Sequence, residues 1–170
     1  MYEMDYDVAS SYWIEKDKSS AHLDEETLKN KIDEFLKNHN TCALATASKD
    51  MVRNTPIEYN YLDGVIYLFS EGGLKFKALK ENKNVSLAIF ESYEGFGKLK
   101  SLQIEAIAEM VEPFSDEYLK LLKHKNLSEE WMRKMPRPLY LIKVVPKVYD
   151  LLDSDLKKDG FDNRQHLEIG

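Results

Sequence analysis

Three lysines follow a pair of glycines in the middle of an acidic chain. The segment Ser70-Glu71-Gly72-Gly73 leads into Lys75, Lys77 and Lys80, which the sequence places on a short helix. One explanation is a solvated helix face, because lysine side chains are mostly exposed. The other is an anion site, because a glycine turn entering a helix presents unpaired backbone N–H groups to a phosphate.

No other pattern in the chain indicates catalysis or a metal site. The sequence has no P-loop, no GxSxG nucleophile turn and no HExxH metal motif. Cys42 is the only cysteine and lies in an apolar run, which predicts a buried, inert thiol. The four histidines are far apart in the sequence and form no ligand spacing, so we predict no metal site: His22, His39, His124 and His166.

Length and charge exclude several classes of protein. The 170 residues, 43% of them hydrophobic, are enough for one domain with its own core. A net charge of −6 argues against a nucleic-acid partner, which calls for a basic face. The first residues lack the basic start and apolar run of a signal peptide, and no later stretch has the length of a membrane span. We therefore expect a cytoplasmic protein with no membrane partner.

The elements around the lysines are predicted from period and turn signals. A helix is expected over 24–37, capped by Asp24. Strands are expected over 41–46, 52–59 and 65–69, consecutive and antiparallel, with the last two forming a hairpin at Asp63-Gly64. Pro56 should confine its strand to an edge or a bulge, because proline cannot donate to a sheet ladder.

The second half of the chain continues the same alternation. Strands are predicted over 85–90, 102–111, 139–145 and 148–152, the last two separated by Pro146, with a helical insertion at about 115–135. The fold class is therefore mainly β with helices (α+β), an antiparallel barrel. Residues 1–23 form an N-terminal extension and residues 24–170 a single domain.

These elements carry a resemblance to a known family. The chain resembles the pyridoxamine 5′-phosphate oxidase-like family of flavin-binding split barrels over about residues 24–152. The resemblance lies in the order of its segments, which are a helix followed by TCALATASKD, MVRNTPIEYNYLDGVIYLFSEGGLKFKALKENKNVSLAIF and LQIEAIAEMVEP. The resemblance implies a split β-barrel that binds FMN at the interface of a homodimer. Independently of the resemblance, the apolar stretch 139–145 predicts an apolar surface that a second copy of the chain covers.

The resemblance also implies where the phosphate of FMN binds. Arg53 on the second strand and Lys75 after the third would hold it, with hydrogen bonds from Ser70 or the Gly72-Gly73 backbone and a lesser contribution from Lys77. A dianionic phosphate suits a forked guanidinium combined with a point charge. The alternative for Arg53 is a surface arginine in a cross-strand ion pair.

The resemblance also implies which residues lie along the flavin ring. Asn54, Thr55 and Pro56 occupy the strand that runs past the isoalloxazine edge, where backbone groups and the Thr55 hydroxyl can hydrogen-bond the ring. Phe69 and Gln103 are weaker candidates, the first as barrel core and the second as a solvated strand position.

Two departures argue against oxidation of vitamin B6. Where the family's true oxidases place a phosphate-gripping lysine, this chain has Glu58, which would repel that dianion unless it points outward to a surface lysine. Leu152 stands in place of their tryptophan, and SDLKKDGFDNRQH does not reproduce their closing arginine and histidine.

Three functions remain open from the sequence. The first is an FMN-dependent oxidoreductase that takes electrons from a reduced nicotinamide and passes them to a small acceptor. The second is a flavin-binding carrier or sensor without turnover. The third is binding of haem or a deazaflavin on the same fold. Since no catalytic side chains stand out, any chemistry would belong to the flavin.

Overall fold

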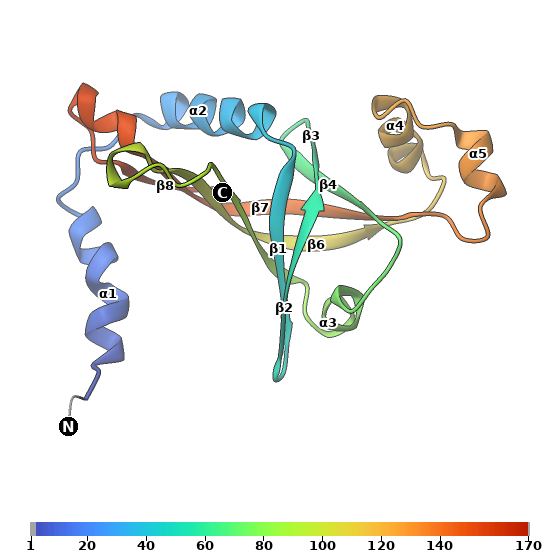
Figure 1. The fold of residues 1–170 in the computed structure, drawn as a ribbon, viewed down its shortest axis with the longest axis horizontal. Coiled ribbons are helices and arrows are strands. Elements are labelled where there is room, and N and C mark those ends of the chain that lie inside the picture. Colours follow the sequence, from blue (N-terminus) through green and yellow to red (C-terminus); the bar gives the residue numbers. More distant parts are fainter. Residues whose placement is uncertain (1–2, 170) are drawn as a thin grey trace.

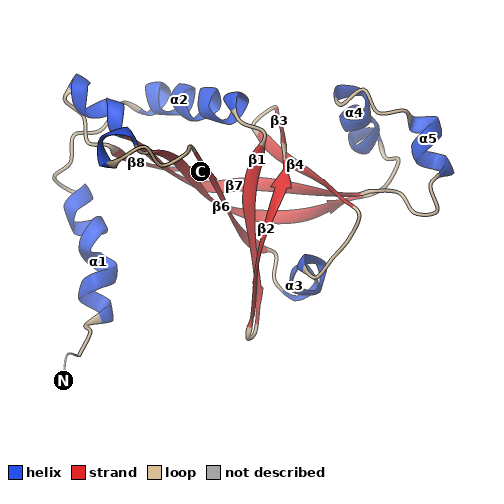
Figure 2. Cartoon of the chain, viewed as in Figure 1, coloured by secondary structure: helices blue, strands red, loops and turns tan. Residues whose placement is uncertain are grey.

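A computed structural model describes residues 3–169. Within them, eight strands form one antiparallel sheet with five α-helices and two short 3-10 helices around it (Figures 1 and 2). In chain order these are α1 (Tyr6–Asp17), α2 (Glu25–Asn38), β1 (Thr41–Ser48), β2 (Met51–Glu58), β3 (Asn60–Leu62), β4 (Val65–Ser70), α3 (Lys75–Glu81), β5 (Asn84–Phe90), η1 (Phe96–Lys98), β6 (Lys100–Val111), α4 (Asp116–His124), α5 (Glu129–Lys134), β7 (Tyr140–Asp153), η2 (Ser154–Asp159) and β8 (Arg164–Glu168).

The sheet has the order β2-β1-β5-β6-β7-β4-β3. One edge of β7 pairs with β6, and the other edge pairs with β4 along its first half and with β8 along its second half. It curls into a half-barrel in which the β1–β2 hairpin crosses the long strands β6 and β7 (Figure 1). The fold class predicted from the sequence, an antiparallel split barrel with helices, is confirmed.

The main core lies on the concave face of the sheet under α2. Asp24 caps this helix by accepting from the Thr27 N–H, as predicted. Leu28, Ile32 and Leu36 then form the stripe that packs on the apolar side chains of the sheet. Cys42 belongs to this core, and burial raises the pKa of its thiol to about 12, which keeps the thiol protonated and unreactive.

A second core lies at the far end of the long strands, under α4 and α5 (Figure 1). Ser115 and Ser128 cap these two helices, each by accepting from the N–H three residues on. Tyr118 is fully buried there, and its hydroxyl donates to the Leu139 carbonyl at 2.9 Å. The helical insertion predicted from the sequence therefore covers the sheet.

One predicted pairing is wrong. The Asp63-Gly64 turn does join a hairpin, and both residues have positive φ as such a turn requires. Its first arm, however, is the separate short strand β3, while β2 pairs only with β1. Strand β2 therefore stands at one end of the strand order, and the β3–β4 hairpin stands at the other. Pro56 sits on an edge strand as expected.

The predicted break at Pro146 is also wrong. Residues 140–153 form one strand, and Pro146 sits in a bulge where the register with β6 shifts between Glu105 and Ala106. A bulge leaves one residue out of the ladder, so it tolerates a residue without an N–H. The apolar stretch 139–145 is covered within the chain, because Leu141, Ile142 and Val144 are fully buried.

Helix α1 and strand β8 are among the elements that the sequence did not predict. Helix α1 stands away from the barrel (Figure 1), with no buried residue. Strand β8 pairs with the second half of β7. None of the helices within residues 3–169 is both long enough and apolar enough to cross a membrane.

Candidate functional site

The turn after β4 folds back on itself through two polar side chains. The Ser70 hydroxyl lies 3.2 Å from both the N–H and the carbonyl oxygen of Gly72, and the Lys75 ammonium donates to that carbonyl at 2.6 Å. Gly73 has φ +112°, and a Cβ there would lie 3.6 Å from Lys75 Nζ. The glycines therefore allow a backbone path that brings Ser70 and Lys75 to the same carbonyl.

Lys75 is buried although it has no counter-ion. Only 7% of the residue is exposed, and within residues 3–169 it forms no ion pair. Burial lowers the pKa of Lys75, and the nearby Arg53 guanidinium lowers that pKa further. A buried ammonium beside a second cation is unfavourable in the free protein, and an anion between the two would relieve both effects.

Arg53 lies on the edge strand of the sheet, near enough to Lys75 to lower the pKa of that lysine. It lies on β2, opposite Thr46 of β1, and β1 and β2 are the strands against which α3 packs. Its side chain is exposed, and in the described part of the chain it takes part in no ion pair. The cross-strand ion pair considered from the sequence is therefore not formed, and the predicted proximity of Arg53 to Lys75 is present.

The remaining lysine of the predicted phosphate site points elsewhere. Lys75, Ala78 and Leu79 form the buried side of α3, whereas Lys77 is exposed. Residues two apart on a helix do not share a face. Lys77 is therefore not part of the pair of cations formed by Arg53 and Lys75.

The predicted flavin residues on β2 divide between the two faces of the sheet. Arg53 and Thr55 lie opposite Thr46 and Leu44 on the core side, whereas Asn54 and Pro56 alternate to the other side. Because β2 is an edge strand, a ligand can contact the core side, the outer side and the free backbone of this strand.

Two predicted residues lie away from the cations. The Phe69 ring packs edge-on against Tyr118 at 5.7 Å between centroids, in the core under α4 and α5. Gln103 lies on β6, where it pairs with Ala88 and Asp150 and lines a separate cavity. Among residues 3–169, the side chains of Phe69 and Gln103 form no hydrogen bond or ring contact with Ser70 or Lys75.

Glu58 is also accounted for by a surface contact. Its Oε1 accepts from the Lys125 ammonium at 2.6 Å, at the C-terminal end of α4. This ion pair matches the outward-pointing alternative considered for Glu58.

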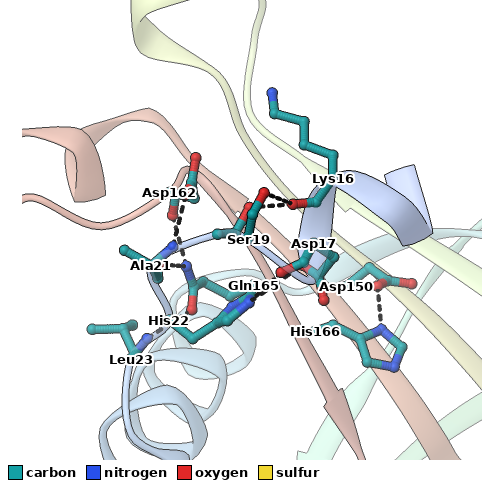
Figure 3. A network of polar contacts seen from close by, with 11 residues as sticks. Lys16, Asp17, Ser19, Ala21, His22, Leu23, Asp150, Asp162, Gln165 and His166 are labelled. Atoms are coloured by element: carbon teal, nitrogen blue, oxygen red, sulfur yellow. Dashed lines mark hydrogen bonds and ion pairs between the residues drawn. The ribbon is translucent and has the colours of Figure 1, made fainter. Parts of the chain in front are cut away.

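The cavity beside Gln103 has a volume of about 560 Å³ and lies between α1 and the strands β6, β7 and β8. Its wall includes Trp13 of α1, with the Arg164 guanidinium 4.1 Å from the ring centroid, and His166 of β8. His166 Nδ1 lies 2.8 Å from an Asp150 carboxylate oxygen, and that contact raises the pKa of His166 (Figure 3).

A hydrogen-bond network joins the chain after α1 to β8 beside this cavity (Figure 3). The buried Gln165 accepts from the Leu23 N–H at 2.9 Å and donates to the Asp162 carbonyl at 2.7 Å. The Asp162 carboxylate accepts from the Ala21 N–H at 2.8 Å. This network is saturated by the protein itself, so we assign it a structural role.

Comparison with known families decides the assignment of the chain. The sequence model described as pyridoxamine 5′-phosphate oxidase matches residues 28–147. The chain belongs to the pyridoxamine 5′-phosphate oxidase family. The match spans both the edge strand with Arg53 and the turn with Lys75. No curated protein matches the chain.

Solved structures share the fold of this pyridoxamine 5′-phosphate oxidase family member. A proposed pyridoxamine 5′-phosphate oxidase from Listeria innocua is 24% identical, with a TM-score of 0.57 over 74% of this chain and 98% of that chain. An FAD-binding protein from Mesorhizobium loti is 20% identical, with a TM-score of 0.56 over 71% and 89%. HutZ, the heme storage protein from Vibrio cholerae, is 19% identical, with a TM-score of 0.58 over 71% and 90%. At these identities the likeness shows the fold alone.

Sequence reasoning set aside two residues that the structure brings together. Arg164 and His166 are two residues apart on β8, so they share a face, and both line the cavity. The alternation R-x-H-x in NRQHLEI was the available signal for a strand. It was missed because β8 is only five residues long and its pairing with β7 is not encoded locally.

Proposed function

We propose that this protein binds FMN and that Arg53 and Lys75 hold its phosphate. The observation that carries the proposal is the buried Lys75 ammonium, which has Arg53 beside it and no carboxylate partner among residues 3–169. A phosphate dianion supplies the missing negative charge and accepts charge-assisted hydrogen bonds from both side chains. Arg53 offers a fork and Lys75 a point charge, which together suit the shape of a phosphate.

The neighbouring groups support a phosphate at this position. The Ser70 hydroxyl and the Gly72 N–H, already in contact, lie at the same turn as Lys75. Thr55 shares the face of Arg53 on β2, and Asn54 and Pro56 pass along the outer side. We propose that these three residues follow the flavin ring, with Thr55 and the free backbone of the edge strand as hydrogen-bonding groups.

We further propose that the protein is an FMN-dependent oxidoreductase. Bound FMN would take a hydride from a reduced nicotinamide and deliver the two electrons to a small acceptor. The chain's own residues would bind and orient, because within residues 3–169 the Ser70 hydroxyl beside Lys75 hydrogen-bonds Gly72 and has no base as a partner. Vitamin B6 oxidation is not proposed, since the chain lacks the phosphate-gripping lysine and has Leu152 in place of the tryptophan. Glu58 pairs outward with Lys125, so the argument rests on the missing lysine and not on repulsion by Glu58.

The test of this function is an absorption spectrum followed by anaerobic reduction. Purified protein reconstituted with FMN is expected to show the flavin bands and to lose them on addition of a reduced nicotinamide. A parallel assay with pyridoxamine 5′-phosphate should give no turnover. Flavin that binds but is not reduced would leave the binding proposal standing and remove the oxidoreductase, whereas turnover of pyridoxamine 5′-phosphate would contradict the specificity.

Haem is a second candidate ligand, favoured by the surroundings of His166. Its Nδ1 is held by Asp150 at 2.8 Å, and a carboxylate behind a histidine is a common arrangement for metal ligands. Its Nε2 lies 3.6 Å from a Glu168 carboxylate oxygen, a contact that an iron bound at Nε2 would replace. Arg164 beside it offers a cation for a propionate. A Soret band after addition of haem that disappears in His166→Gln would favour this candidate, and its absence would exclude it.

We also propose that the protein is a homodimer. On the side of β1, β2 and β5 opposite the core, Val52 and Phe90 are 77% and 66% exposed, beside Ala43, Ala45 and Ala88. Small and apolar side chains on a flat sheet face favour close packing against a second copy.

Light scattering tests the dimer. The wild-type protein is expected to be dimeric at micromolar concentration, and Phe90→Lys should shift it toward the monomer because a charge would be buried at the interface. Trp131→Lys is the matched control, since Trp131 is 57% exposed on α5. A monomeric wild-type protein would contradict the proposal.

A further inference from the structure

Thr46 has a buried hydroxyl group with no hydrogen-bond partner. The residue is 2% exposed, and its Oγ1 is the one buried side-chain nitrogen or oxygen in residues 3–169 without a partner. Such an unpaired group destabilises the folded protein, and valine would fill the same space without that cost. A threonine at this position therefore calls for a partner that the ligand-free arrangement does not supply.

Among the sheet neighbours of Thr46 on the core side, one candidate donor remains. Asn82, at the end of α3, already donates its side-chain amide to the Ala47 carbonyl at 2.9 Å. Val85 on β5 lies directly opposite, and Leu44 lies two residues before Thr46 on β1, and both are apolar. Ser48, two residues after Thr46, already donates its hydroxyl to a Glu81 carboxylate oxygen at 2.5 Å.

The remaining neighbour is Arg53, directly opposite Thr46 on β2. Opposed residues of an antiparallel pair have Cβ atoms about 5 Å apart, a distance that an arginine side chain can span. The guanidinium has five N–H donors, and in the described part of the chain Arg53 has no ion pair to occupy them.

We propose that Thr46 is the positioning residue for Arg53 in the anion site. Its Oγ1 accepts a hydrogen bond from the Arg53 guanidinium when that group turns toward a phosphate held by Lys75. An Arg53 N–H that the phosphate does not use thereby gains an acceptor. The hydrogen bond also fixes the plane of the guanidinium so that two of its other N–H groups can bind the phosphate. This inference rests on the proposed FMN site and adds to it a residue that makes no contact with FMN.

The test compares FMN with riboflavin, which lacks the phosphate. Dissociation constants of both flavins are measured on the FMN-free protein by fluorescence titration, for the wild type, Thr46→Val and Thr46→Ser. We expect Thr46→Val to weaken FMN binding about tenfold and to leave riboflavin binding unchanged, on the scale of one hydrogen bond to a charged group. Thr46→Ser keeps the hydroxyl and should show the same ratio of riboflavin to FMN dissociation constants as the wild type.

Two controls separate positioning from packing. Thr41→Val makes the same change on β1 opposite Glu58 and should leave the ratio unaltered. In an Arg53→Ala background, Thr46→Val should have no further effect on the ratio, because the hydrogen bond acts only through Arg53. Thr46→Val is also expected to raise the melting temperature of the FMN-free protein, a readout that confirms the variant folds.

The possible failures are distinct. Equal affinity of the wild type for FMN and riboflavin would overturn the proposed phosphate site itself. A wild type that prefers FMN, with the same preference in Thr46→Val, would overturn the role of Thr46 alone. Equal effects of Thr46→Val with and without Arg53 would do the same.

Discussion

Replacing Lys75 by methionine is expected to lower the affinity for FMN about 100-fold, on the scale of charge-assisted hydrogen bonds to a phosphate. Methionine keeps the length of the side chain and removes the charge. Riboflavin binding should change little, because the lost contact is to the phosphate. Calorimetric titration of the FMN-free variant with the two flavins measures both effects.

Lys77→Met is the matched control for this prediction. It makes the same substitution two residues along α3, on the exposed side of the helix, and should leave FMN affinity within about twofold. A loss of FMN affinity as large in Lys77→Met as in Lys75→Met would show that general positive charge, and not the site at Lys75, attracts the ligand.

Lys75→Met should also change how the stability of the FMN-free protein depends on pH. The pKa of Lys75 is lower in the folded protein than in the unfolded chain, so the unfolded chain binds more protons between the two values. Folded stability attributable to Lys75 therefore rises as the pH increases through that interval. Denaturant titrations should show this rise in the wild type relative to the variant, and parallel curves would contradict a perturbed lysine.

The second large effect is expected in the core that supports the site strands. Leu44 is fully buried on β1, opposite Leu87 on β5 and Thr55 on β2. Leu44→Ala should lower the free energy of unfolding by about 3 kcal/mol, from lost burial and the cavity left behind. Urea denaturation measures this change.

Val8→Ala serves as the control for Leu44→Ala. Val8 lies on α1, away from the proposed dimer face, and is 66% exposed, so the protein should lose less than about 0.5 kcal/mol. A loss below about 1 kcal/mol in Leu44→Ala would contradict a packed barrel interior at this position.

Local signals accounted for most elements of the fold. The cap at Asp24 and the turn at Asp63-Gly64 depend on a few adjacent residues, and both were predicted. Pairing was less accessible, because the choice of β3 rather than β2 as the partner of β4 depends on how the whole sheet curls. The bulge at Pro146 likewise depends on the register of β6, which the sequence of β7 does not reveal.

The candidate site divides in the same way. Arg53 and Lys75 were predicted as phosphate ligands from the family resemblance, and in the structure Arg53 lies near enough to lower the pKa of Lys75. Their role as phosphate ligands stays a prediction. The contact of Phe69 with the flavin stays a prediction, and its ring packs against Tyr118 under α4 and α5. That packing had no signal in the sequence, because alternation along β4 does not say which face the two helices cover. The unpaired hydroxyl of Thr46 had no signal in the sequence, since threonine is common in strands and its lack of a partner is a property of the folded core.

The central claim is that a phosphate binds between Arg53 and Lys75. Its most direct test is a calorimetric titration of the FMN-free wild-type protein with FMN and, under the same conditions, with riboflavin. The buried Lys75, which has no carboxylate partner among residues 3–169, predicts that FMN binds at least about 100-fold more tightly than riboflavin. Equal dissociation constants for the two flavins would contradict it.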